Sequence, residues 1–325
     1  MQSSSGGGAS ALSEAIIRKG GAVFGACYSP DFRSAEFACA ETLADLPKLK
    51  GSKYIPTNKR VLINGEYVSL WQAVAGKLTE GRPVLFTGLG CDVAGLKSYM
   101  AANSIGIRNL YTADLICYGP VPLAVHKQFI DSLERRYNSR IKSFTARHKP
   151  KGWTPPYVLA EFEDGRKFCE PLYETDYGVA FGGYAREACY GCRFKDAGHQ
   201  ADITLGDYWG LTRRDSGVWN PDGVSVFIVR TERGEELLRM IDTEDFALSP
   251  ADVKFVVEHN KMYYMCRDKP GDYGKFFADL KALGLHRAVV SRTGRLRYYA
   301  RRVKNRVKKL IPRPVKRIIK AILGR

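Results

Sequence analysis

The chain has 325 residues, 45% of them hydrophobic, which fits one large globular domain or two smaller ones. Its formal net charge of +17 is uneven, because residues 291–325 hold 14 Lys or Arg and no Asp or Glu, whereas the other 290 hold 37 basic and 34 acidic residues. No apolar run reaches the ~20 residues of a membrane span, and no signal peptide is recognisable. Eight cysteines in such a chain favour a reducing cytosol, with thiols that are free, metal-bound or catalytic.

A Ser/Gly run opens the chain, directly before a helix that apolar spacing predicts over residues 9–19. The run consists of Ser3, Ser4, Ser5, Gly6 and Gly7. Taken alone it could be a flexible linker. Hydroxyls and backbone N–H groups leading into a helix N-terminus can also bind an anion such as phosphate. Both interpretations stay open at this point, and a buried strand is predicted to follow over residues 22–28.

Helices and strands then alternate along the chain. Helices are predicted over residues 42–49, 70–79, 92–101 and 123–137, and buried strands over residues 83–88 and 110–116. This alternation favours a parallel sheet whose carboxyl ends open onto a ligand crevice. Thr87 and Gly88 close the first of these strands and are candidate ligand contacts. In an earlier loop, Lys53 could contact a phosphate, although a solvated surface lysine is the simpler alternative.

From residue 141 the pattern changes. Residues 141–144 and 157–162 have the pattern of antiparallel strands, residues 223–231 predict a further strand, and residues 232–241 and 249–259 predict helices. The whole pattern predicts an α/β (mixed α+β) fold. Its expected parts are a central, partly parallel sheet with flanking helices, an antiparallel insertion and a C-terminal basic amphipathic helical tail.

Four cysteines lie in predicted loops: Cys91 and Cys117 at strand ends, and Cys189 and Cys192 in a Cys-x-x-Cys turn. Four thiolates can bind a [4Fe-4S] cluster or a zinc ion. Structural zinc sites more often use two Cys-x-x-Cys pairs that are close in sequence, and here only one pair is of that kind. The spacing therefore favours a cluster over zinc but does not decide between them. Two core thiols plus a separate redox dithiol are the third alternative. The other cysteines are interpreted as buried small hydrophobic residues: Cys27, Cys39, Cys169 and Cys266.

A Gly-Asp-Tyr-Trp-Gly turn over residues 206–210 follows the Cys-x-x-Cys pair. Its acid, Asp207, and its aromatic residues, including Trp209, could hold a planar cofactor. No side chain stands out as a general acid or base. Asp92, His148 and Asp207 are candidates, but a lone histidine in a basic loop is more often a surface residue.

Several motifs, in order over residues 3 to about 235, resemble one family. They are the Ser/Gly run, Gly51-Ser52-Lys53-Tyr54, the stretches 85–96 and 114–119, Gly152-Trp153, Cys189-Tyr190-Gly191-Cys192 and the stretch 202–210. With them the chain resembles the beta subunit of coenzyme F420-reducing hydrogenase and F420H2 dehydrogenase. This family of flavin iron–sulfur proteins also includes the plant 7-hydroxymethyl chlorophyll reductase.

The resemblance implies a flavin, FAD or FMN, that exchanges hydride, and a [4Fe-4S] cluster that relays single electrons. The implied cluster ligands are Cys91, Cys117, Cys189 and Cys192. The implied flavin contacts are Ser3, Ser4, Ser5, Gly6, Gly7, Lys53, Thr87, Gly88, Asp207 and Trp209. The resemblance therefore implies that the Ser/Gly run binds the phosphate of the flavin and is not a linker. The implied segments are a flavin-binding part over residues 1–82, a C-terminal domain over residues 83–290 and the tail over residues 291–325.

The chain departs from the family pattern near the implied cluster. Many relatives carry a ferredoxin-like segment before the Ser/Gly run, and we expect this chain to work without one. Gly90 and Asp92 flank Cys91 where relatives often have Pro and Gln or His, and Tyr118 replaces a His after Cys117. We therefore expect an external electron donor, such as ferredoxin or a reduced deazaflavin or nicotinamide, and we do not assign F420 as the substrate.

Many bacterial relatives lie among capsule and exopolysaccharide genes. The resemblance therefore implies a flavin- and [4Fe-4S]-dependent oxidoreductase in capsular or exopolysaccharide biosynthesis at the cytoplasmic membrane face. The alternative is a non-catalytic structural or interaction protein of a polysaccharide-assembly complex, in which a cluster or a zinc ion only stabilises the fold. The departures near the implied cluster favour this alternative. Homo-oligomers or polysaccharide-assembly partners are compatible with either hypothesis.

The basic tail repeats an amphipathic helical pattern on both sides of Pro312 and Pro314. Such a pattern suits an anionic membrane surface, where each basic residue contributes about 1 kcal/mol. A helix packed on the body of the protein is the alternative. Nucleic acid is not expected as a partner, because aromatic interleaving is limited to Tyr298 and Tyr299. The expected location is the cytoplasm, with peripheral membrane association.

Overall fold

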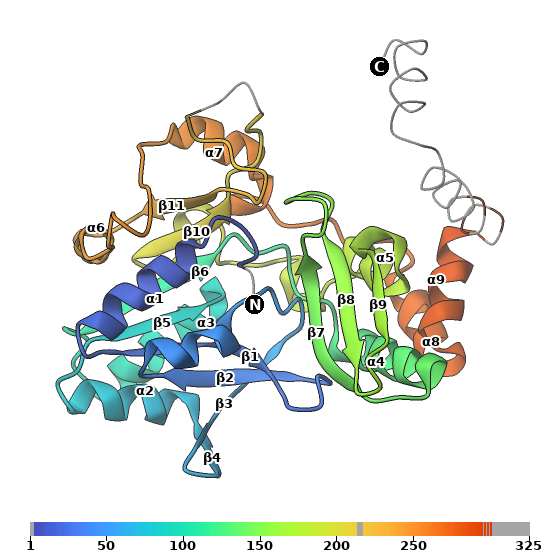
Figure 1. Ribbon diagram of the computed structural model, residues 1–325, viewed down its shortest axis with the longest axis horizontal. Helices are drawn as coiled ribbons and strands as arrows, with labels where there is room; N and C mark the ends of the chain where they lie inside the picture. The colour runs from blue at the N-terminus through green and yellow to red at the C-terminus, as the bar shows by residue number, and fades with distance from the viewer. Residues whose placement is uncertain (1–2, 213–216, 295, 297, 299, 301–325) are drawn as a thin grey trace.

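The computed structural model describes residues 3–212, 217–294, 296, 298 and 300, which form two lobes (Figure 1). The first lobe contains an eight-stranded sheet of order β11-β10-β6-β5-β1-β2-β3-β4. Its strands are β1 (Ala22–Tyr28), β2 (Ala35–Ala40), β3 (Thr57–Ile63), β4 (Glu66–Ser69), β5 (Val84–Gly88), β6 (Leu110–Leu115), β10 (Ile203–Asp207) and β11 (Ser225–Val229). The second lobe contains a three-stranded antiparallel sheet of β7 (Ile141–His148), β8 (Tyr157–Phe162) and β9 (Lys167–Pro171).

The central sheet is mixed. Strands β1, β5, β6 and β10 pair in parallel, whereas β2 pairs antiparallel with β1 and β11 pairs antiparallel with β10. The carboxyl ends of the four parallel strands therefore meet at one edge, which is where open α/β sheets bind ligands. The predicted fold class, a partly parallel sheet with an antiparallel insertion, is confirmed.

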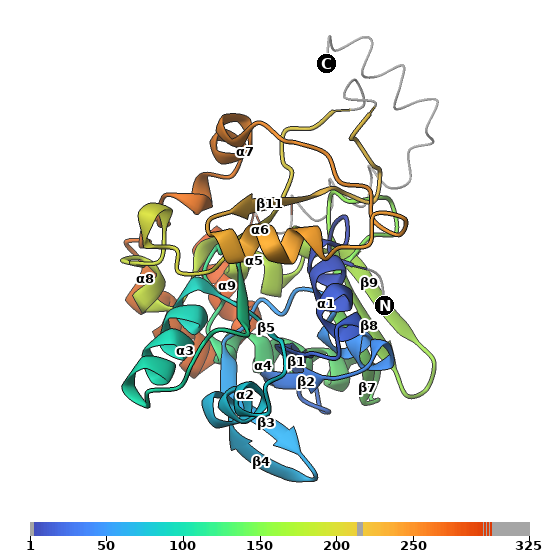
Figure 2. The ribbon, with the colours of Figure 1, turned by 90° about the vertical axis from the view of Figure 1, so that its left-hand side faces the viewer.

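Helices cover both faces of the central sheet. Val23 and Leu85 point toward α1 (Gly8–Arg18) and α6 (Glu232–Arg239), and the next residues, Phe24 and Phe86, point toward α2 (Leu70–Thr79) and α3 (Gly90–Ala102). Side chains alternate in this way because successive strand residues face opposite sides of a sheet. Figure 2 shows the two helix layers on either side of β1 and β5. Strands β1 and β5 therefore bury apolar side chains on both faces, as the sequence predicted.

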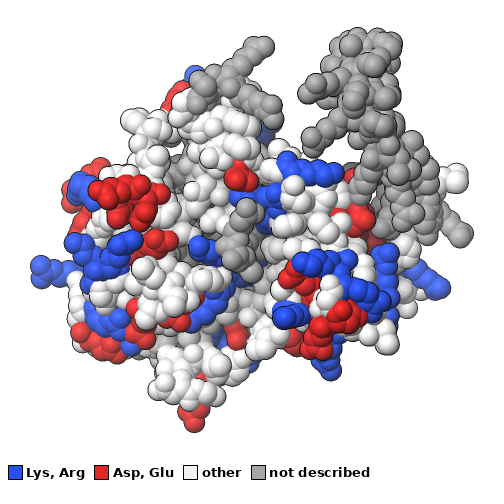
Figure 3. Space-filling view, viewed as in Figure 1, with Lys and Arg blue, Asp and Glu red and all other residues white. Residues whose placement is uncertain are grey.

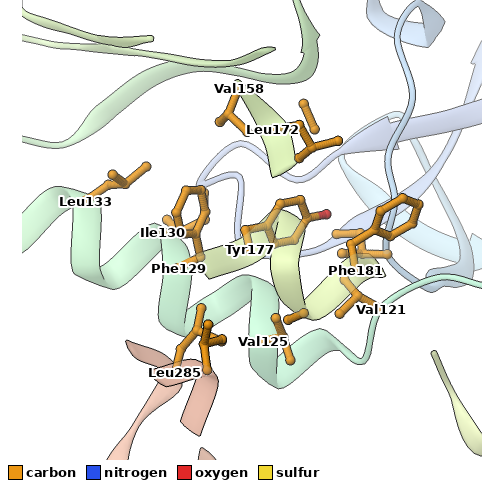
Figure 4. Close-up of a cluster of buried hydrophobic side chains, with 14 of the residues drawn as sticks. Val121, Val125, Phe129, Ile130, Leu133, Val158, Leu172, Tyr177, Phe181 and Leu285 are labelled. Carbon is orange, nitrogen blue, oxygen red and sulfur yellow. The ribbon is translucent and has the colours of Figure 1, made fainter. Parts of the chain in front are cut away.

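The second lobe has a separate aromatic core between its sheet and four helices. These helices are α4 (Leu123–Tyr137), α5 (Asp176–Gly183), α8 (Tyr273–Leu283) and α9 (Leu285–Thr293). Tyr177 of α5 stacks on Phe129 of α4 with ring centroids 5.3 Å apart, and Figure 4 shows both rings at the centre of the cluster. Aromatic pairs of this kind contribute about 0.5–1.5 kcal/mol beyond their buried area.

Most predicted elements lie where the sequence places them, with α2 and α4 matching their predicted ranges. The predicted helix over residues 42–49 is a 3₁₀ helix, η1 (Leu43–Leu49), with Pro47 inside it. The predicted helix over residues 249–259 is shortened to α7 (Val253–His259). Strands β2, β3 and β4 were not predicted. In β3 only Val61 is buried, so its sequence lacks the apolar alternation that marks a strand.

The predicted tail over residues 291–325 lies largely outside the described residues. Over the face shown in Figure 3, Lys and Arg are intermixed with Asp and Glu, in keeping with the near balance of charge in residues 1–290. No helix in the described part of the chain is long and apolar enough to cross a membrane.

The buried histidine of the second lobe provides a test of the fold through pH. His126 is fully buried, stacks on Tyr28 and has Nε2 at 2.6 Å from the Phe32 carbonyl oxygen. Burial lowers the pKa of His126 to about 4, although the contact with Phe32 opposes the shift. Unfolded His has a pKa of about 6.5, so below that pH the unfolded chain gains a proton that the folded chain excludes.

We therefore predict that protonation of His126 in the unfolded chain lowers the unfolding free energy by about 3 kcal/mol as the pH falls from 6.5 to 4. In urea denaturation, His126→Phe should lose stability less steeply than the wild type over this window. His286→Gln, which changes an exposed histidine, is the matched control and should keep the wild-type slope. Equal slopes for all three proteins would contradict a neutral, buried His126.

Candidate functional site

The carboxyl edge of the parallel strands gathers most of the predicted site residues. Thr87 and Gly88 end β5, Cys117 follows β6 by two residues, and Asp207 is the last residue of β10. Thr87 Oγ1 donates to the Phe24 carbonyl oxygen at 3.1 Å, which ties β5 to β1. These residues are far apart in the sequence, and the strand order of the folded sheet places them at one edge.

The Ser/Gly run enters the same edge and is part of the folded domain. Ser5 Oγ donates to the Val224 carbonyl oxygen at 2.9 Å, and the Gly8 N–H donates to Ser225 Oγ at 3.2 Å. Gly7, with φ of 89°, directly precedes α1. A Cβ on Gly6 would lie 2.8 Å from the Ser225 backbone nitrogen, so the close approach requires glycine. The run is therefore a packed loop at a helix N-terminus and not a linker.

Two other segments contact this loop. Ser4 Oγ lies 2.9 Å from Ser52 Oγ, and Lys149 Nζ donates to the Ser5 carbonyl oxygen at 3.4 Å. Lys53, next to Ser52, donates to the Leu49 and Lys50 carbonyl oxygens at 2.8 and 2.9 Å. Burial lowers the pKa of Lys53 to about 8. The predicted phosphate ligand Lys53 is thus engaged with the C-terminal end of η1.

A cavity of about 400 Å³ lies beside Lys53, within the usual size range of ligand pockets. Aromatic walls and basic groups line it together: Tyr28, Phe37 and Phe144 supply rings, and Lys48, Lys50 and Lys53 supply cations. A planar ring system with an anionic tail matches such a lining. Ser52 lines the cavity and contacts Ser4, so the cavity adjoins the Ser/Gly loop.

The four predicted ligand thiols lie near enough to influence one another electrostatically, although the Cys91 side chain is exposed. Partial burial, the Asp92 carboxylate and the Cys117 thiol raise the pKa of Cys91 to about 12, with a further contribution from Cys192. Burial raises the pKa of Cys117 to about 11, and Cys189 and Cys192 contribute to the rise. The thiols at the strand ends are therefore close enough to the Cys-x-x-Cys pair to influence its charge.

Backbone geometry supports this grouping. The Gly119 N–H donates to Cys117 Sγ at 3.2 Å, and a Cβ on Gly119 would lie 3.0 Å from Cys189 Cβ. Lys195 binds the Cys117 carbonyl oxygen and thereby ties the segment after Cys192 to the end of β6. Among the described residues, no three His, Cys, Asp or Glu side chains converge closely enough to bind a single metal ion.

Asp207 and Trp209 bind the second lobe. Arg147 Nη2 donates to Asp207 Oδ2 at 2.6 Å, and Arg147 Nη1 donates to the Tyr54 hydroxyl at 3.3 Å. Trp209 stacks on Trp153 with centroids 4.5 Å apart and an interplanar angle of 3°. Arg147 and Trp153 come from the antiparallel insertion, so these contacts hold the two lobes together at the carboxyl edge. Sequence reasoning did not single out Arg147 or Tyr54.

The three candidate acid–base residues have different settings. Asp92 is buried, accepts from the Leu89 N–H at 3.0 Å and pairs with Lys59 at 2.6 Å, so it caps α3 and is already engaged. Asp207 is paired with Arg147 as described. His148 is partly exposed, and burial lowers its pKa. Two of the three candidates, Asp92 and Asp207, therefore serve structural contacts.

The interpretation of the remaining cysteines as buried residues is wrong. Cys169 is exposed, and Cys27, Cys39 and Cys266 are partly exposed. Cys27 and Cys39 line the cavity, and Cys266 Sγ donates to the Cys192 carbonyl oxygen at 3.5 Å. The sequence places Cys266 far from the four thiols along the chain, and only the folded structure reveals that contact.

A family model that describes the C terminus of the coenzyme F420 hydrogenase/dehydrogenase beta subunit matches residues 81–254, which is more than half of the chain. The chain belongs to the coenzyme F420 hydrogenase/dehydrogenase beta subunit family. The matched region contains all four candidate ligand thiols, while the Ser/Gly loop lies before it. Family membership supports a beta-subunit-like oxidoreductase with an iron–sulfur centre.

Among solved structures, this beta-subunit-family chain is similar to one from a xenon-derivatized F420-reducing [NiFe] hydrogenase complex of Methanosarcina barkeri. The two share 18% identity with a TM-score of 0.48, over 80% of this chain and 84% of that chain. No curated protein matches the sequence.

The ion pair between Arg147 and Asp207 gives the most direct test of how the lobes of this family member are joined. Their side chains are only 11% and 15% exposed, and removing one partner of a buried pair costs about 3–5 kcal/mol. We predict that Asp207→Asn lowers the unfolding free energy by about 2–3 kcal/mol in urea denaturation, because some solvent still reaches the pair. Asp164→Asn removes the partner of the more exposed Arg166 and should cost under about 1 kcal/mol. Losses of similar size in both variants would contradict this role.

Proposed function

We propose that the chain is a flavin- and [4Fe-4S]-dependent oxidoreductase whose two redox groups share the carboxyl edge of the parallel strands. The observation that carries the proposal is that loops from distant segments bring Cys91 and Cys117 to the carboxyl edge that the packed Ser/Gly loop also enters. Four thiols form the usual ligand set of a [4Fe-4S] cluster, and a clustered set of soft ligands is otherwise costly to keep. The family match over residues 81–254 supports the same interpretation.

The chemistry of four thiol donors fits a cluster. Cys91, Cys117, Cys189 and Cys192 would hold it, and the Gly119 N–H, which already donates to Cys117 Sγ, stabilises that sulfur as a thiolate. The raised pKa of Cys91 and Cys117 means that both thiols are protonated at neutral pH in the metal-free chain. Binding must therefore displace protons, so loading should be stronger at higher pH.

The aromatic and basic lining of the cavity fits a flavin, either FAD or FMN, and of the proposed flavin contacts Lys53 is the one that lines the cavity among the described residues. Ser3, Ser4, Ser5, Gly6 and Gly7 would present hydroxyl and N–H groups to its phosphate, with Lys53, Thr87, Gly88, Asp207 and Trp209 as further contacts. A bound flavin would supply both two-electron hydride exchange and one-electron exchange with the cluster. The aromatic walls of the cavity would orient the ring system and exclude water.

The finer assignments are part of this proposal. A ferredoxin, or a reduced deazaflavin or nicotinamide, is the proposed electron donor. A role in capsular or exopolysaccharide biosynthesis at the cytoplasmic membrane face rests on the family resemblance and on the basic pattern of residues 291–325. The proposed organisation is a flavin-binding segment over residues 1–82, a C-terminal domain over residues 83–290 and the tail.

Single cysteine variants test the proposed redox centre. Anaerobically purified protein should show flavin bands together with broad iron–sulfur absorbance near about 400 nm. Cys91→Ser, Cys117→Ser, Cys189→Ser and Cys192→Ser should each remove the same iron–sulfur absorbance, because all four thiols bind one centre. Cys169→Ser, at an exposed position, is the matched control and should keep it. Colourless protein with stoichiometric zinc would instead support the alternative in which the metal only stabilises the fold. If the variants of one cysteine pair lose the absorbance and those of the other pair keep it, a single site is ruled out.

Deletion of residues 292–325 tests the proposed membrane contact. The full chain should float with liposomes that contain anionic lipid and should be released by salt, since each basic residue contributes about 1 kcal/mol that salt screens. The shortened chain should stay in the soluble fraction. Neutral phosphatidylcholine liposomes provide the control. If the shortened chain floats with the liposomes as well as the full chain does, the tail does not make the membrane contact.

A further inference from the structure

A buried carboxyl group stands in the wall of the cavity beside Lys53. It belongs to Glu36 of β2, which lines the cavity and is only 5% exposed. Arg60 Nε donates to Glu36 Oε2 at 3.1 Å, and the Tyr67 hydroxyl donates to Glu36 Oε1 at 3.0 Å. The Arg60 guanidinium also lies over the Tyr67 ring, 3.8 Å from its centroid. None of the functions assigned above uses Glu36.

The two donors hold Glu36 from the outer side of the sheet. Arg60 is on β3 and Tyr67 is on β4, the strand at that end of the sheet order. On the inner side, Glu36 pairs with Cys27 of β1, and both residues line the cavity. Each carboxyl oxygen has two lone pairs. One donor to each oxygen therefore leaves acceptor positions on Glu36 for a ligand in the cavity.

The rest of the lining falls into two groups. Tyr28 and Phe32, which come at and after the end of β1, and Phe144 of β7 provide aromatic surface. Lys48 and Lys50 provide positive charge from the C-terminal end of η1. Since β7 belongs to the second lobe, the cavity lies between the lobes. It thus combines aromatic rings, a buried acceptor and cations in one space of about 400 Å³.

A ribonucleotide has a matching part for each of these groups. Its base can stack on the aromatic rings, its ribose hydroxyls can donate to the carboxyl group, and its phosphates can bind the lysines. Carboxyl groups hold ribose hydroxyls in this way in other nucleotide sites. An apolar ligand would bury Glu36 without compensation for its lost hydration. A simple inorganic anion would leave the aromatic surface unused and would lie beside an acid.

We propose that the cavity binds a ribonucleoside diphosphate group, with Glu36 accepting hydrogen bonds from the ribose hydroxyls and Lys48 and Lys50 binding the phosphates. The inference rests on the proposed function in that the same cavity is taken as part of the flavin site. The same chemistry occurs in the adenosine diphosphate part of FAD and in a separate nucleoside diphosphate substrate, whereas FMN has no such part. Glu36 is thereby the residue that selects ribose over deoxyribose.

ADP and its 2′-deoxy and 3′-deoxy analogues test the role of Glu36. Binding to the full chain, freed of any flavin, is measured by isothermal titration calorimetry. The wild type should bind each deoxy analogue about tenfold more weakly than ADP, because each lacks one hydrogen bond to Glu36. Glu36→Leu removes the acceptor and should bind all three nucleotides within about twofold of one another. Glu66→Leu, at an exposed position on β4, is the matched control and should keep the wild-type preference.

A lysine variant tests the phosphate contact separately. Lys50→Gln should weaken ADP binding by about tenfold and leave the binding of adenosine unchanged, because only ADP carries phosphates. Lys127→Gln, which changes an exposed lysine of α4, should alter neither affinity. The comparison of the three nucleotides on the wild-type chain decides the ribose contact even if Glu36→Leu does not fold.

Chromatography of flavin extracted from the purified chain identifies the source of the nucleotide group. If FAD must be removed before ADP binds, the group is part of the cofactor. If ADP binds while the flavin is retained, the group belongs to a separate substrate.

Equal binding of ADP and both deoxy analogues by the wild type, or a preference that Glu36→Leu keeps, would overturn the inference. A chain that binds flavin without any ribose preference would keep the proposed function and lose this inference. A chain that holds neither flavin nor iron, but binds ADP with a preference that depends on Glu36, would do the reverse.

Discussion

The parallel pairing of β1, β5, β6 and β10 is the constraint on which the site depends. Parallel strands end at the same edge, so segments far apart in sequence deliver their following loops to one place. Cys91 lies just after β5, Cys117 just after β6, and the Asp207 turn begins where β10 ends. The Ser/Gly loop reaches that edge because α1 packs on the face of β1 and β5. A different strand order would separate the thiols from the loop.

The second lobe is held against this edge by polar and aromatic contacts. Arg147 joins Asp207 to Tyr54, and Trp153 covers Trp209, so the antiparallel insertion closes over the ends of the strands. These contacts are shielded from solvent, which strengthens the ion pair and makes its loss costly. The same residues lie next to the Ser/Gly loop through Lys149. Stability of the lobe interface and the shape of the proposed cofactor site therefore depend on the same side chains.

Periodicity and motif order were enough to predict the fold class and the buried strands β1, β5 and β6. That Cys91, Cys117, Cys189 and Cys192 form one site stays a prediction. Periodicity and motif order could not predict β3, because an edge strand with one buried side chain has no clear alternation. They also could not reveal the contact between Arg147 and Asp207, since it has no local sequence signal. The position of Cys266 beside Cys192 shows the same limit, because chain separation conceals a contact made by folding.

The proposed function depends most on one claim, that the four thiols bind a single iron–sulfur centre. Iron and acid-labile sulfide analysis of anaerobically purified protein, combined with electron paramagnetic resonance after dithionite reduction, measures this directly. We predict about four irons and about four sulfides per chain, and one reducible paramagnetic signal. Protein that contains zinc without sulfide, or that retains its iron and sulfide after Cys117→Ser, would contradict the claim.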